Sequence, residues 1–135
     1  MKEFKTEAKT ENLHAVLGFI DEQLEQMDCP MKQQMKIDIA VEEIFVNIAH
    51  YAYVPKTGEV TIRMEFDHNP TEIEITFIDR GVPYDPLAKP DPDVTLSAKE
   101  RVIGGLGIFM VKKSMDEVKY EHLDGCNILT IKKGW

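Results

Sequence analysis

Glu43 and Asn47 are the first pair of residues in this sequence whose types and spacing could do chemistry. Residues four positions apart project from the same face of a helix, so both side chains can reach one ligand. The asparagine offers a carbonyl oxygen that suits a hard cation such as Mg²⁺, and the glutamate offers a proton acceptor beside it. Taken alone, this spacing is more often that of a solvated helix face.

A second group of polar residues, Asp79-Arg80-Gly81, follows a stretch whose apolar residues alternate. That alternation predicts that the end of the strand lies near the core, where a carboxylate needs a hydrogen-bond donor. The exocyclic amine of adenine is one such donor, and Gly81, which has no Cβ, would let the backbone approach a flat base closely. The simpler alternative is a tight turn in which Asp79 bonds its own backbone.

A third group is the glycine-rich segment 104–107, which runs directly into a predicted helix. Unpaired backbone N–H groups at a helix start, together with the helix dipole, can bind phosphate oxygens. The segment has neither the GK[ST] ending of a P-loop nor the G-x-G-x-x-G spacing of a dinucleotide fold. Each of the three groups is a weak signal alone, but their order along the chain strengthens all of them.

Two amphipathic helices must position the first group. Apolar residues recur at helical spacing from Leu13 to Met27, with Asn12 available as the N-cap, and again across residues 31–51. A further helix is expected after the glycine segment, with Lys112 and Lys113 near its C-terminal end, where cations suit the helix dipole.

Strands are predicted where the apolar period changes to two. Residues 60–66 and 73–77 alternate on either side of a turn and predict an antiparallel hairpin. Residues 117–122 and 127–133 form two last strands, and a weak strand precedes the first helix. The proline-rich stretch 82–103 between hairpin and glycine segment is interpreted as a lid.

These elements predict an α/β (α+β) two-layer sandwich, with a mixed, mostly antiparallel sheet and helices on one face. A single domain is expected over residues 1–135, because a chain of this length can bury a core without metal or disulfide staples. The net charge of −8 opposes direct binding of nucleic acid. Charges interrupt every apolar run, so we expect no membrane span and no secretory signal, and a cytoplasmic protein.

In this order, the motifs resemble those of the histidine-kinase-like ATPase (GHKL) superfamily, and within it the bacterial anti-sigma-factor serine-protein kinases. Residues 40–47 are similar to the family's N-box, residues 79–86 to its first glycine box and residues 104–108 to its second. The form D-x-G-x-P-aromatic-D-P at residues 79–86 is fairly specific to this subgroup. The resemblance covers nearly the whole chain and implies the Bergerat-type fold with an ATP lid.

The resemblance also implies a role for each of these residues. Asn47 would bind Mg²⁺ and Glu43 would act as general base toward a substrate serine. Asp79 would hold the adenine amine and Gly81 would line the base pocket. The cofactors implied are ATP and Mg²⁺, and the glycines that would cover the phosphates are Gly105 and Gly107.

The sequence departs from the family pattern in two places. The family often has a histidine four residues after the metal asparagine, but here that position is Tyr51, and we assign His50 no role. The closing Gly-Thr-Thr-like turn reads Gly125-Cys126-Asn127, so the hydroxyl contact to the nucleotide is not matched. Thr130 is a weak substitute and is better interpreted as an ordinary strand threonine.

The function expected from the resemblance is an ATP- and Mg²⁺-dependent serine/threonine-protein kinase that acts as an anti-sigma factor. Its partners would be an anti-anti-sigma factor, which accepts the phosphoryl group, and a sigma factor, which it sequesters. A homodimer is implied. The first alternative is a nucleotide-gated protein-binding module with little or no kinase activity. A second alternative, a purely structural interaction domain, predicts no nucleotide binding.

Overall fold

In a computed structural model of the chain, residues 1–53, 56–68, 71–88 and 105–135 are described. Much of the predicted lid, and Gly104, lie outside the described residues. The elements, in chain order, are β1 (Lys2–Glu7), η1 (Thr10–Asn12), α1 (Leu13–Gln26), α2 (Met31–Tyr51), β2 (Glu59–His68), β3 (Thr71–Asp79), η2 (Pro86–Ala88), α3 (Gly105–Ser114), β4 (Glu117–Leu123) and β5 (Cys126–Gly134).

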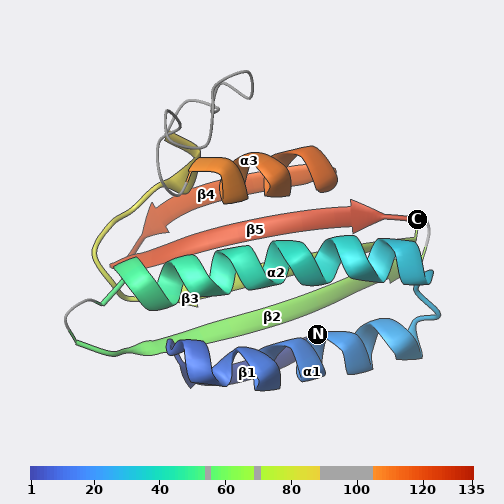
Figure 1. The fold of residues 1–135 in the computed structure, drawn as a ribbon, viewed down its shortest axis with the longest axis horizontal. Coiled ribbons are helices and arrows are strands. Elements are labelled where there is room, and N and C mark those ends of the chain that lie inside the picture. Colours follow the sequence, from blue (N-terminus) through green and yellow to red (C-terminus); the bar gives the residue numbers. More distant parts are fainter. Residues whose placement is uncertain (54–55, 69–70, 89–104) are drawn as a thin grey trace.

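The five strands form one sheet in the order β1-β2-β3-β5-β4, and each neighbouring pair is antiparallel. The helices α1, α2 and α3 all cover the same face of this sheet (Figure 1). The sequence-based prediction of a two-layer sandwich and of a hairpin between β2 and β3 is therefore confirmed. No helix in the described ranges is both long and apolar enough to cross a bilayer.

The apolar stripe of α2 forms the centre of the core. Ile37, Val41 and Phe45 are completely buried against the sheet, with Ile44 almost so. Helix α1 adds a narrower stripe made of Val16, Ile20 and Leu24. Burial of one face of each helix, rather than helix propensity alone, holds both on the sheet.

Strand alternation decides which polar residues face the helices. In β3, Ile73, Ile75, Phe77 and Asp79 are all buried, so the carboxylate at the strand's end lies on the helix side of the sheet. Residues of β5 follow the same rule, because Asn127 alternates with the buried Leu129 and Ile131 and pairs with Asp79 across the ladder. A carboxylate and an amide thus lie side by side on the buried face.

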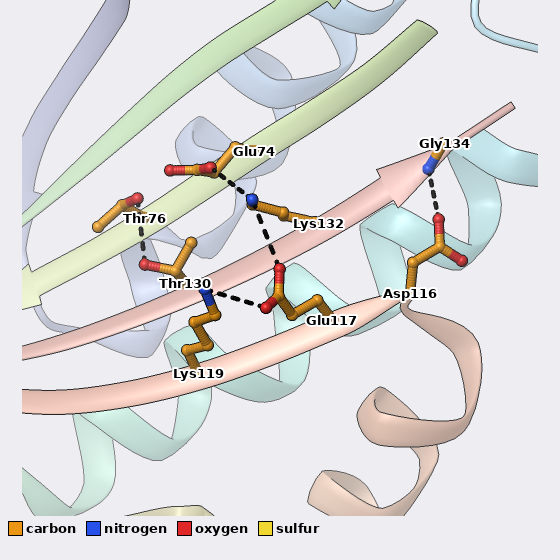
Figure 2. Close-up of polar contacts among 8 residues, drawn as sticks. All are labelled: Glu74, Thr76, Asp116, Glu117, Lys119, Thr130, Lys132 and Gly134. Carbon is orange, nitrogen blue, oxygen red and sulfur yellow. Dashed lines mark hydrogen bonds and ion pairs between the residues drawn. The ribbon is translucent and has the colours of Figure 1, made fainter. Parts of the chain in front are cut away.

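The opposite face of the sheet is largely polar, and none of the helices in the described residues lies on it. Figure 2 shows a ladder across β3, β5 and β4 in which Lys132 Nζ lies 3.5 Å from carboxylate oxygens of both Glu74 and Glu117. In the same region the hydroxyls of Thr76 and Thr130 are 3.4 Å apart (Figure 2). Thr130 is therefore an ordinary strand threonine on the face away from Asp79, as the sequence analysis favoured.

Two details of the helix starts differ from the sequence-based expectations. Asn12 does not cap α1, because its side chain donates to the backbone oxygen of Glu7 at 3.0 Å instead. Helix α3 begins at Gly105 rather than after Gly107, so both glycines lie in its first turn. Their missing side chains do not break the helix here because they are at its end, where fewer hydrogen bonds form.

Candidate functional site

A pocket lies between α2 and the buried face of the sheet, next to the ends of β3 and β5. It brings together two of the predicted site residues, Asn47 and Asp79, which are far apart in the sequence. The other residues that line it are mostly apolar or aromatic, which is typical of a small-molecule site. They are Ile44, Ile48, Tyr51, Ala52, Phe77, Val82, Tyr84, Pro86, Ile108, Tyr120, Asn127 and Leu129.

Asp79 is the buried acid of this pocket, with 5% of its surface exposed. Its Oδ1 accepts hydrogen bonds from the backbone N–H of Gly81 and from Asn127 Nδ2, both at 2.9 Å. Among the described residues, nothing donates to Oδ2. Buried polar atoms are usually paired, so an acceptor left open in a pocket is suited to a ligand that carries a donor.

Asn47 reaches the same pocket from α2, and no side-chain hydrogen bond to it exists among the described residues. Its amide is therefore available to a ligand. Glu43, one turn earlier, does not line the pocket and lies instead beside the start of α3. A Cβ built on Gly107 would stand 2.2 Å from Glu43 Oε2, so the carboxylate contacts the bare Cα of this glycine.

Close packing against the end of α2 favours glycine at residue 81. A Cβ at this position would come within 2.2 Å of the backbone oxygen of Ala52, at the end of α2. The same oxygen accepts a hydrogen bond from the N–H of Val82 at 2.8 Å. The glycine therefore lets the segment after β3 pass close to α2, and it bonds Asp79 rather than lining the pocket itself.

Tyr53 also fixes the segment that follows β3, through hydrogen bonds of its hydroxyl group. Its hydroxyl donates to the backbone oxygen of Glu59 and accepts from the N–H of Arg80, both at 2.7 Å. Burial is the main cause that raises the pKa of the Tyr53 phenol, so the group is a neutral donor and acceptor over the physiological range. This one side chain ties the start of β2 to the residue that follows Asp79.

Two aromatic rings narrow the pocket. The ring centroids of Tyr51 and Tyr84 are 5.8 Å apart, and 46% of the Tyr51 side chain and backbone surface remains exposed. The enclosed volume is about 40 Å³. An apolar cavity of about 150 Å³ holds benzene, so the cavity in this structure is too small for a single aromatic ring.

The donor set fits a metal ion only when the ion is shared with a ligand. No cluster of three or more His, Cys, Asp or Glu side chains with metal-binding geometry exists in the described part of the chain. Asn47 offers a single amide oxygen. Mg²⁺ keeps several waters and commonly binds through few protein groups plus phosphate oxygens, so the residues present fit Mg²⁺ that arrives with a nucleotide.

Asn127 is a polar residue of the pocket that the motifs in the sequence do not single out. The sequence places it in a turn that departs from the family pattern and at the start of the last predicted strand, and it predicts no role for the side chain. The available signal was alternation, because Asn127 occupies the same face as Leu129 and Ile131 in a strand whose inner positions are otherwise apolar. A polar residue at a buried position requires partners, and here one of them is Asp79.

Comparison with known proteins agrees with this geometry. Residues 6–133 match the family model described as "Histidine kinase-like ATPase domain". The curated proteins named "Serine-protein kinase RsbW" from Bacillus cereus (strain B4264) and Bacillus anthracis are 31% and 30% identical to this chain over 98 residues. Those residues are 70% of this chain and 60% of each relative, so the match spans less than two thirds of the relatives' length.

Two solved structures share the fold. The RsbU and RsbW domains of a Mycobacterium tuberculosis protein match 98% of this chain, and 32% of their own, with a TM-score of 0.68 and 14% identity. In the SiaB-SiaC complex from Pseudomonas aeruginosa, the match covers all of this chain and 90% of the other, with a TM-score of 0.63 and 14% identity. Because the family model covers nearly the whole sequence, the chain belongs to the histidine kinase-like ATPase domain family.

Proposed function

We propose that this chain is a serine/threonine-protein kinase that binds ATP with Mg²⁺ in the pocket between α2 and the sheet. The observation that carries the proposal is that Asp79, a buried residue whose Oδ2 accepts no hydrogen bond from the described residues, lines the same pocket as Asn47. The family, and the RsbW kinases with which the chain shares 31% identity, support the nucleotide and the type of reaction.

The base would bind at the Asp79 end of the pocket. An adenine amine can donate to Asp79 Oδ2, while Phe77, Ile108 and Leu129 provide apolar surface for the flat ring. Tyr51 and Tyr84 would move apart to admit the base and could then stack on it. A base that presents an oxygen in place of the amine would face the carboxylate and be rejected.

The phosphates would extend from the base pocket toward Asn47 and the first turn of α3. Backbone N–H groups at a helix start have no partner within the helix, and the dipole favours an anion there. Gly105 and Gly107 lie in this turn and let phosphates approach the backbone. Asn47 would hold Mg²⁺, which neutralises charge on the phosphates when it is bound.

Glu43 is the residue proposed to handle the proton. It lies on α2 one turn from Asn47 and touches Gly107, so it stands where α2 meets the proposed phosphate site. In the reaction, the hydroxyl oxygen of the acceptor side chain bonds the γ-phosphorus as the bond to the β-phosphate oxygen breaks. Glu43 accepts the hydroxyl proton, and ADP leaves.

The partners are proposed from the similarity to the RsbW kinases. The acceptor would be a serine or threonine on an anti-anti-sigma factor, and the same chain would sequester a sigma factor in the cytoplasm as a homodimer. The net charge of −8 opposes direct binding of nucleic acid. It does not exclude a nucleotide, because a divalent metal and local backbone dipoles can outweigh a distant surface charge. These partners are proposals about the complete activity, since the match spans 60% of the RsbW relatives.

A phosphoryl-transfer assay tests the kinase directly. Purified chain is mixed with Mg²⁺, γ-labelled ATP and a candidate anti-anti-sigma protein encoded near it, and label on that protein is followed over time. We expect transfer by the wild type and a loss of at least about 100-fold in Glu43→Gln, which removes the base but keeps the shape. Glu42→Gln is the matched control, because Glu42 is the exposed neighbour on the same helix.

Equal transfer by wild type and Glu43→Gln would contradict the role of Glu43. If Mg²⁺·ATP binds in a calorimeter but no acceptor is ever labelled, the nucleotide-gated binding module replaces the kinase. If a titration with ATP shows no binding, both nucleotide-dependent functions are excluded and the structural interaction domain remains.

A further inference from the structure

The side chain of Asn127 makes hydrogen bonds in every direction available to an amide. Only 6% of the residue is exposed. Its Nδ2 donates to Asp79 Oδ1 and to the backbone oxygen of Val82, both at 2.9 Å. Its Oδ1 accepts from the Tyr120 hydroxyl and, at 3.4 Å, from the N–H of Tyr84. One amide therefore joins β3, β4, β5 and the segment after Asp79.

These contacts fix the polarity of the amide as well as its position. A backbone N–H such as that of Tyr84 can only donate, and a backbone carbonyl such as that of Val82 can only accept. The oxygen of Asn127 must therefore face Tyr84, and its NH₂ group must face Asp79. A rotated amide would place two oxygens together at Asp79 and again at Val82, at the cost of leaving buried acceptors unpaired.

The polarity of Asn127 decides which oxygen of Asp79 is open. With Gly81 N–H and Asn127 Nδ2 both on Oδ1, that oxygen is occupied, and Oδ2 is the oxygen of this pocket-lining residue that has no donor among the described residues. We infer that Asn127 is a positioning residue that sets the base specificity of the site, with Tyr120 holding it in register. The inference rests on the proposed function and assigns within it a residue that selects a purine with an amine at position 6.

A purely structural role for Asn127 predicts something different. Loss of a buried hydrogen-bond hub lowers stability and weakens every ligand of the pocket by the same factor. A positioning role changes the ratio of affinities between a base with an amine and one with an oxygen at the same place. The ratio of the two affinities is the decisive quantity, because a general loss of affinity lowers both values by the same factor and leaves their ratio unchanged.

The test compares Mg²⁺·ADP with Mg²⁺·IDP, whose base carries an oxygen where adenine carries the amine, by calorimetry at one salt concentration. The variants are Asn127→Ala, which removes the amide, and Tyr120→Phe, which removes only the hydroxyl that holds its oxygen. Thr130→Val is the matched control, because it lies on the same strand with its side chain on the opposite face. Thermal melts of all four proteins report stability separately.

We expect the wild type to prefer ADP, Asn127→Ala to reduce the ADP/IDP ratio by about tenfold, and Tyr120→Phe to reduce it by a smaller factor. Thr130→Val should leave the ratio unchanged. A wild type that binds ADP, together with an unchanged ratio in Asn127→Ala, overturns the inference alone. If Asn127→Ala does not fold, an unchanged ratio in Tyr120→Phe overturns it. If the wild type binds neither diphosphate, the proposed function fails as well.

Discussion

The carboxylate of Glu43 lies directly against the bare Cα of Gly107, so that any side chain at residue 107 would collide with the proposed catalytic base. Glu43 comes from α2 and Gly107 from the first turn of α3, and these two helices pack together on the sheet (Figure 1). The glycine is therefore explained by the position of Glu43, in addition to the access that it gives phosphates.

Gly107→Ala tests this contact. Alanine favours a helix over glycine by up to about 1 kcal/mol, so the melting temperature should not fall by much. The new Cβ must displace Glu43, and we expect the rate of phosphoryl transfer to fall by about tenfold or more. Gly18→Ala is the control, because a Cβ there meets nothing within 4 Å and should raise stability without changing the rate. If Gly107→Ala transfers the phosphoryl group as fast as the wild type, the contact between Glu43 and Gly107 has no role in the reaction.

Gly81→Ala should act on stability and nucleotide binding together. The added methyl group would meet the backbone oxygen of Ala52, which cannot rotate away, and would strain the Val82 to Ala52 hydrogen bond. Overpacking of this kind costs about 1–3 kcal/mol. Urea unfolding measures the loss of stability, and an ADP titration measures the loss of affinity. Normal values for both would show that this segment moves freely away from α2.

Tyr53→Phe removes one hydroxyl that serves two backbone groups. The N–H of Arg80 and the backbone oxygen of Glu59 would lose their partner, and we expect the free energy of unfolding to fall by about 1–2 kcal/mol. Because Arg80 follows Asp79, the affinity for ADP should also decrease. Chemical unfolding of Tyr53→Phe beside Tyr51→Phe measures the effect, because Tyr51 is an exposed tyrosine with 46% of the residue surface accessible. Equal stability of the two variants would contradict it.

The raised pKa of the Asp38 carboxyl should make the stability of the fold depend on pH. The pKa of Asp38 is raised to about 8 in the folded chain, mainly because the carboxyl is partly buried. A hydrogen bond with Asp21, and the negative charges of Asp21 and Glu25, raise this pKa further. Gln34 Nε2 donates a hydrogen bond to Asp21 Oδ1 at 3.2 Å, so this oxygen of Asp21 is occupied. The folded state thus binds a proton more tightly than the unfolded state, whose carboxyl has a pKa near the ordinary value of 3.8.

This favourable contribution is fully present below about pH 4 and is lost as the pH rises toward 8. Asp38→Asn should therefore be more stable than the wild type at pH 8 by about 1–2 kcal/mol, a value reduced because the carboxyl keeps some contact with water. The two proteins should be similar at pH 4. Unfolding curves from pH 4 to 8, with Glu22→Gln as an exposed control, measure the difference. A difference that shrinks as the pH rises would contradict it.

Periodicity in the sequence was sufficient for the main layers of this fold. The stripe around Ile37, Val41 and Phe45 predicted α2, and alternation in β2 and β3 predicted the hairpin, because burial of one face dominates both patterns. Alternation also placed Asp79 at a buried strand end. It could not show that α3 begins at Gly105, since glycine is a poor helix former and its place at a helix start depends on tertiary contacts.

The residues that support the site were harder to predict. The contact between Glu43 and Gly107 joins two helices that are far apart in the sequence, and no local pattern reports the distance between them. Asn127 could be placed on the buried face by alternation, but the identity of its partners depends on the register between β3 and β5. Motifs therefore indicated which residues could meet a ligand, while the hydrogen bonds that orient them required the structure.

We expect a nucleotide to bind with its base at Asp79 and its phosphates between Asn47 and the start of α3. The most direct test is a crystal structure of the chain grown with Mg²⁺ and a non-hydrolysable ATP analogue. We predict density in this pocket, with the adenine amine about 3 Å from Asp79 Oδ2 and the phosphates beside Gly107. A pocket still closed by Tyr51 and Tyr84, or a nucleotide bound elsewhere, would contradict it.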